Sequence, residues 1–158
     1  MEYENYQLKN TFFNDISLEK KLCENTVKSS WKIMPTFIEN VRKLQQNKNS
    51  DGVSYPLLDK EFYYFIIENE KKIETIIKEV KEENEPFDMT YFGLQTLQNK
   101  YLLKTHDGFH ESIEYLWLRI SLFIHGNNWE KVKQMYSDLR QGYYIHATPT
   151  LFNAGTRN

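Results

Sequence analysis

The sequence has 158 residues, the length of one domain that can bury a hydrophobic core. Its 20 Lys and Arg against 22 Asp and Glu give a formal net charge of −2, and no basic cluster indicates a nucleic-acid partner. The single cysteine, Cys23, excludes an internal disulfide framework, and no apolar run reaches the roughly 18 residues of a membrane span, so we expect a cytoplasmic protein.

Apolar residues at helical spacing predict helices through the first part of the chain. One begins at Ser17, whose side chain can cap it, and another follows Pro35. The polar stretch 47–52 should be a surface loop. Residues 59–80 fit either one long helix or two in series, and Thr90 can cap the helix after them.

The next part contains the helix with the widest apolar surface. The dipeptide Asp107-Gly108 first predicts a tight hairpin turn. Residues 112–126 then carry apolar side chains over so wide an arc that their helix should be buried on most sides. A further helix is capped by Asn127 or Asn128 and ends at Gly142, and the short link predicts that the two helices lie antiparallel.

The pattern changes after this helix. Tyr143, Tyr144 and Ile145 are strand formers, so we expect a strand at Tyr143–Thr148, followed by a loop. The predicted fold is mainly α, with strands only there and near 101–109. Small and turn-forming residues directly after a strand place backbone N–H groups and hydroxyls where anionic ligands commonly bind.

No pattern of metal ligands or catalytic groups is visible, and we assign neither a metal site nor a catalytic residue. The histidines lie in different segments and are better explained as surface or packed side chains than as ligands or bases. They are His106, His110, His125 and His146.

Two segments resemble a known family. Residues 146–156, HATPTLFNAGT, are similar to the HA(S/T)PTLFNAGT signature of ribonucleotide reductase large subunits of the eukaryotic and viral type. Residues 91–97, YFGLQTL, followed by YLLK at 101–104, resemble the family's YFG-KTLE-SYLLK block. The two segments stand at the family's spacing, and the resemblance extends over residues 50–156.

The resemblance implies a domain organisation. Residues 1–49 would be a helical lead-in, at most a remnant of the family's ATP-cone, and residues 50–142 would be the large-subunit helical domain. Residues 143–158 would start the family's ten-stranded α/β barrel, with the strand Tyr143–Thr148 as its first. Thr148 matches the Ser or Thr that contacts the diphosphate of the ribonucleotide substrate.

The implied activity is that of ribonucleoside-diphosphate reductase, which makes deoxyribonucleotides for DNA synthesis by thiyl-radical chemistry. The complete enzyme is expected to use ATP or dNTP effectors and a di-iron small subunit, and to contain a large-subunit dimer. Cys23 matches none of the family's catalytic cysteines, so the chain alone should be inactive until the rest of the large subunit completes it. The alternative is a stand-alone helical protein-interaction module derived from this fold, and a downstream reading frame encoding the barrel would favour the first interpretation.

Overall fold

The computed structural model describes residues 36–157, so the helix predicted at Ser17 and Cys23 lie outside the described residues. The chain divides into two compact units; described residues 36–87 and 98–157 belong to one, and 88–97 to the other. The described residues form helices and no β-strand, in the order α2 (Phe37–Gln45), α3 (Lys60–Glu68), α4 (Glu70–Glu83), α5 (Tyr91–Lys100), α6 (Ile113–His125), α7 (Trp129–Arg140) and α8 (Thr148–Asn153). The prediction of a mainly α fold is confirmed.

Side-chain caps define the helix ends largely where the sequence predicts them. The Ser112 side chain accepts a hydrogen bond from the Tyr115 N–H at 3.2 Å, and α6 ends at Gly126 with φ 51°. Of the two candidate asparagines, Asn128 caps α7, accepting from the Lys131 N–H at 3.3 Å. In the smaller unit, Thr90 accepts from the Gly93 N–H at 3.2 Å and so caps α5 as predicted.

The open question about residues 59–80 is settled by Asn69, which ends α3 and begins α4. Its side-chain amide donates to the Phe65 backbone oxygen at 2.8 Å, which satisfies a carbonyl in the last turn of α3. The chain therefore forms two helices in series. None of the described helices is long and apolar enough to cross a bilayer.

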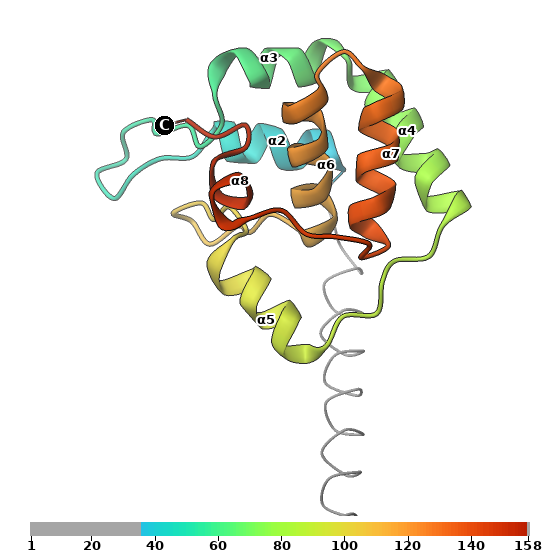
Figure 1. The fold of residues 1–158 in the computed structure, drawn as a ribbon. Coiled ribbons are helices and arrows are strands. Elements are labelled where there is room, and N and C mark those ends of the chain that lie inside the picture. Colours follow the sequence, from blue (N-terminus) through green and yellow to red (C-terminus); the bar gives the residue numbers. More distant parts are fainter. Residues whose placement is uncertain (1–35, 158) are drawn as a thin grey trace, which may run out of the picture. The chain divides into compact units, whose positions relative to one another are not determined.

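Helix α6 is the centre of the larger unit, since every residue from Tyr115 to Leu122 is buried. Helices α7 and α8 pack against α6 (Figure 1). Aromatic rings join further helices to this core: Phe37 of α2 lies 5.4 Å from Tyr115 of α6, and Phe62 of α3 lies 5.7 Å from Phe123 of α6. Most buried core side chains are aliphatic, and the aromatic rings connect α2 and α3 to α6.

The hairpin predicted at Asp107-Gly108 is present as a single bridge between Lys104 and His110. The Thr105 N–H donates to the Phe109 backbone oxygen at 2.9 Å. Gly108 has φ +89°, a conformation that glycine adopts without steric cost. The prediction of a turn is confirmed, but the strands predicted near 101–109 are absent from the described structure.

The strand predicted at Tyr143–Thr148 is wrong for this structure. Residues 144–147 lie between a turn at Gly142 and α8, and none of them pairs with another described residue. Thr148 already belongs to α8, with Pro149 in the first turn, where its fixed φ suits a helix. Strand formers become a strand only beside a partner backbone, and the described residues offer none to this segment.

Candidate functional site

The segment 146–156, hereafter the signature segment, folds as α8 followed by a tight turn. Its turn is fixed at Gly155, where φ is +70° and a Cβ would lie 2.3 Å from the Phe62 ring. The Gly155 carbonyl accepts from the Asp59 N–H at 3.0 Å, and Thr156 bridges to Leu58. The end of the signature segment is thus held against the start of α3, and only glycine fits there without strain.

At the other end of the signature segment, Thr148 is the first residue of α8 and is exposed. Its Oγ1 lies 3.2 Å from the hydroxyl of Tyr101, a residue 47 positions earlier in the chain. The Tyr101 ring packs on Phe152 of α8, with ring centroids 4.9 Å apart. Two hydroxyls from distant segments therefore meet at the start of α8.

A buried ion pair links the same two segments to α6. The side chains of Arg119 and Glu111 are only 2% and 1% exposed. Arg119 Nε donates to Glu111 Oε1 at 2.7 Å, and Nη2 donates to Oε2 at 3.0 Å. Arg119 Nη1 donates to the Ala154 backbone oxygen, while Glu111 Oε2 accepts from the Leu103 N–H at 3.2 Å. Both charges are paired and hydrogen-bonded, as burial requires.

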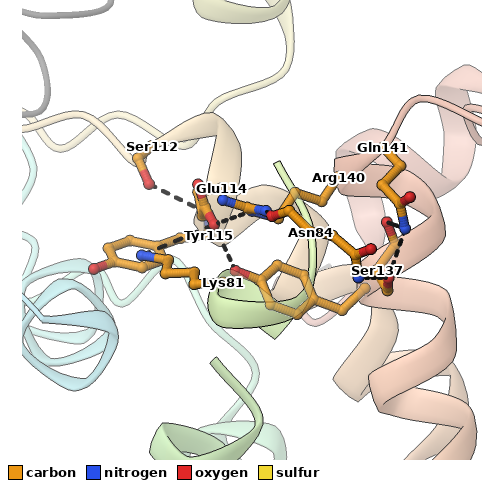
Figure 2. Close-up of polar contacts among 9 residues, drawn as sticks. Lys81, Asn84, Ser112, Glu114, Tyr115, Ser137, Arg140 and Gln141 are labelled. Carbon is orange, nitrogen blue, oxygen red and sulfur yellow. Dashed lines mark hydrogen bonds and ion pairs between the residues drawn. The ribbon is translucent and has the colours of Figure 1, made fainter. Parts of the chain in front are cut away.

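A second polar cluster joins α4, α6 and α7 around Glu114 (Figure 2). Glu114 Oε1 accepts from the Tyr136 hydroxyl and from Arg140 Nε, each at 2.8 Å, and lies 3.8 Å from Lys81 Nζ. Arg140 Nη1 also donates to the Asn84 backbone oxygen at the end of α4. Burial and the adjacent carboxylate raise the pKa of Tyr136, so its hydroxyl stays protonated and serves as a donor.

Because Tyr136 and Arg140 lie near the end of α7 and Glu114 lies near the start of α6, this cluster also shows that the two helices are antiparallel, as predicted. Glu114, the one carboxylate of this cluster, is engaged by these donors. The cluster therefore holds α4, α6 and α7 together, and its carboxylate is not free for acid or base chemistry.

His146, at the start of the signature segment, is packed edge-on against the Tyr144 ring with centroids 5.4 Å apart. Burial lowers the pKa of His146, and the neighbouring His125 lowers it further. Among residues 36–157 no group of three or more His, Cys, Asp or Glu is placed to hold a metal ion. A packed imidazole is the better description of His146.

Comparison with known proteins gives the family. Residues 87–158 match the family described as the all-alpha domain of ribonucleotide reductase. The ribonucleoside-diphosphate reductase large subunit of Acanthamoeba polyphaga mimivirus is 34% identical over 122 residues, which cover 76% of this chain and 13% of the relative. The corresponding large chain of Cryptosporidium parvum is 39% identical over 114 residues, which cover 72% of this chain and 14% of the relative. This chain belongs to the ribonucleotide reductase large-subunit family.

The large subunit of Trypanosoma brucei brucei is also 39% identical, over 106 residues that cover 64% of this chain and 12% of the relative. The chain thus spans only 12% to 14% of the length of these reductase subunits. The matched family region, 87–158, contains both halves of the Tyr101–Thr148 hydroxyl pair and the whole Glu111–Arg119 ion pair. Two of the segments recognised in the sequence, 101–104 and 146–156, are therefore brought together within the larger unit.

The two ion pairs were not anticipated from the sequence of this reductase domain. A signal for one of them was present: Arg119 interrupts the apolar residues of the most hydrophobic helix, and a charge in such a place is rarely buried without a partner. Its partner Glu111 carries no such signal, because it stands before the helix among polar residues. Glu111 is placed by its hydrogen bonds with Leu103 across the predicted turn, and sequence spacing does not specify this placement.

Proposed function

We propose that this chain is the N-terminal part of a ribonucleoside-diphosphate reductase large subunit. Together with the catalytic remainder of that subunit, it serves in reducing ribonucleoside diphosphates to deoxyribonucleotides for DNA synthesis. The observation that supports this most directly is the meeting of two family segments, where the Tyr101 and Thr148 hydroxyls lie 3.2 Å apart. A helical bundle that had kept only the general fold would have no need to hold these side chains together.

We propose Thr148 as a contact to the substrate's diphosphate. Its residue type and position match the family's phosphate-contacting Ser or Thr, and its exposure leaves it open to a ligand. A hydroxyl that donates to a charged phosphate oxygen contributes about 1.5 to 3 kcal/mol when the site is enclosed, and less when water competes. The contact therefore matters once the rest of the large subunit closes around α8.

The proposed partners are the remainder of the large subunit, a second large subunit and a small subunit. Exposed apolar side chains support a covering partner near the signature segment: Tyr143 is 72% exposed, Ile145 59% and Phe152 43%. For the complete enzyme the proposal includes a di-iron small subunit, which the family resemblance implies. ATP or dNTP effectors belong to the same proposal for the complete enzyme.

The test is a large subunit in which residues 50–157 of this chain replace the matching segment of the Cryptosporidium parvum relative. With a small subunit, the chimaera should bind and reduce CDP, whereas this chain alone should form no deoxyribonucleotide. Thr148→Val should raise the Kd for CDP about tenfold, and Thr148→Ser should have a mild effect. Thr75→Val is the matched control, because it removes another exposed hydroxyl, one that donates to the Lys71 backbone oxygen at 2.9 Å within α4.

A folded chimaera that does not bind CDP would overturn the proposed function and favour the stand-alone interaction module. Equal affinity of the Thr148→Val variant and the parent would remove this residue from the site and leave the reductase assignment in place. Deoxyribonucleotide formation by the isolated chain would contradict the proposal that catalysis needs the remainder of the large subunit.

A further inference from the structure

We infer that Tyr101 is a positioning residue for diphosphate recognition, whose hydroxyl holds the Thr148 hydroxyl so that its proton points to a phosphate oxygen. The inference rests on the proposed function and extends it to a second residue. Its basis is the 3.2 Å separation between the Tyr101 hydroxyl and Thr148 Oγ1, together with the fixed setting of both residues.

The phenol of Tyr101 reaches Thr148 from a well-supported piece of backbone. The next residue, Leu102, is buried, and Leu103 exchanges hydrogen bonds with Glu111. The Leu103 N–H donates to Glu111 Oε2 at 3.2 Å, and the Leu103 carbonyl accepts from the Glu111 N–H at 2.8 Å. Because Glu111 is itself locked by a buried arginine, the Tyr101 backbone has little freedom to move away.

The other side of the hydroxyl pair is equally restrained. The ring of Tyr101 rests on Phe152, one turn along α8 from Thr148, with ring centroids 4.9 Å apart and planes inclined at 47°. The end of α8 is held by Arg119, which donates to the Ala154 backbone oxygen. The same buried ion pair therefore fixes the segment that carries Tyr101 and the helix that carries Thr148.

The chemistry of two hydroxyls sets the direction of the proton. A threonine hydroxyl has one proton to donate and two lone pairs to accept with. When Thr148 donates to an anion, the neighbouring phenol of Tyr101 is left to donate to Thr148 Oγ1. Such a chain polarises each bond in it and strengthens the terminal donor. Without the phenol, the Thr148 side chain can change rotamer or turn its proton toward water.

The positioning step can be measured in this chain without any substrate. Three-bond couplings at the 13C-labelled Thr148 methyl group report the side-chain rotamer, and a Thr148→Ser sample assigns the signal. We expect one dominant rotamer in the parent and averaged couplings in Tyr101→Phe, which keeps the ring and removes only the hydroxyl. Unchanged couplings in that variant would overturn the inference.

Tyr143→Phe is the matched control, since it also removes an exposed phenol with a single 3.2 Å hydrogen bond, in this case donated to Gln141 Oε1. The control should leave the Thr148 couplings as they are in the parent. Averaging of the couplings by both substitutions would overturn the specific role of Tyr101.

The functional step is measured by CDP binding to the chimaeric large subunit, in a double-mutant cycle over positions 101 and 148. Tyr101→Phe should raise the Kd about threefold to tenfold, the effect of one ordinary hydrogen bond, with KM raised and kcat little changed. In the Thr148→Val background the same substitution should change the Kd by less than about twofold, because the residue acts only through the hydroxyl that is gone.

The outcomes distinguish a failure of the inference about Tyr101 from a failure of the proposed function. An equal loss from Tyr101→Phe in both backgrounds would mean a general effect on the fold and would overturn the inference. Parent-like binding by the single variant would do the same, while leaving the proposed function standing. If the parent chimaera itself binds no CDP, the proposed function fails, and the inference fails with it.

Discussion

Replacement of Arg119 by methionine should be among the most destabilising substitutions in residues 36–157. Methionine fills most of the volume but leaves Glu111 as a buried carboxylate without its cation, at a site where the two side chains are 2% and 1% exposed. Removal of one member of a buried pair costs about 3 to 5 kcal/mol, because the remaining charge has lost its solvent and its partner. Domains of this size are stable by only about 5 to 15 kcal/mol, so this loss is a large fraction of the total free energy of unfolding.

The double variant Glu111→Leu with Arg119→Met should be less destabilised than the sum of its single variants. No charge is then left at this site, although the Leu103 N–H and the Ala154 carbonyl each lose a partner. An unsatisfied backbone group of this kind costs about 1 to 3 kcal/mol. The expected pattern is therefore a strong coupling between positions 111 and 119.

Urea denaturation followed by far-ultraviolet circular dichroism measures these free energies of unfolding in the chain as it stands. The control is Arg42→Met, because Arg42 and Glu70 form the same type of pair at 3.5 Å with side chains 49% and 37% exposed. That surface pair should be worth at most about 1 kcal/mol. If the Arg119 and Arg42 variants lost equal stability, or if the effects at 111 and 119 were additive, the reasoning about burial would be refuted.

Three further outcomes are expected. Gly155→Ala should cost about 2 to 5 kcal/mol, since its Cβ would strike the Phe62 ring at a φ of +70°, whereas Gly52→Ala, at φ +76° in open space, should cost only about 1 to 2 kcal/mol in denaturant titrations. Burial and His125 lower the pKa of folded His146 below 6.5, so the unfolded chain binds the proton first as the pH falls. The contribution of His146 to the free energy of unfolding is therefore fully present above about pH 6.5 and is lost as the pH falls below it. His146→Gln should reduce this loss between about pH 7 and 5 in thermal melts, and an unchanged pH dependence would contradict the assignment. The far-ultraviolet spectrum of the chain should be dominated by helix, and a sheet-dominated spectrum would contradict the fold.

Signals that act within one or two turns were readable from the sequence. Ser112 and Gly126 bound α6, and Asn128 starts α7, because a cap needs only its own helix to be satisfied. The turn at Asp107-Gly108 was also readable, since its geometry depends on glycine at a positive φ. The strand predicted at Tyr143–Thr148 failed for the opposite reason, because a strand is completed only by a neighbouring backbone.

The sequence by itself therefore determined where helix forms between residues 36 and 142, most of the caps and the family resemblance of the signature segment, all of which depend on local spacing or on residue identity. Helix α8 was not among these predictions. Only the tertiary structure decided that Tyr101 lies beside Thr148, and that Arg119 joins Glu111 to the end of α8. These contacts join residues 47, 8 and 35 positions apart, and the chain must first fold around α6 to bring them within hydrogen-bonding distance. Which residues meet in these contacts depends on packing and on the need to pair buried charges. No local sequence pattern encodes either of these.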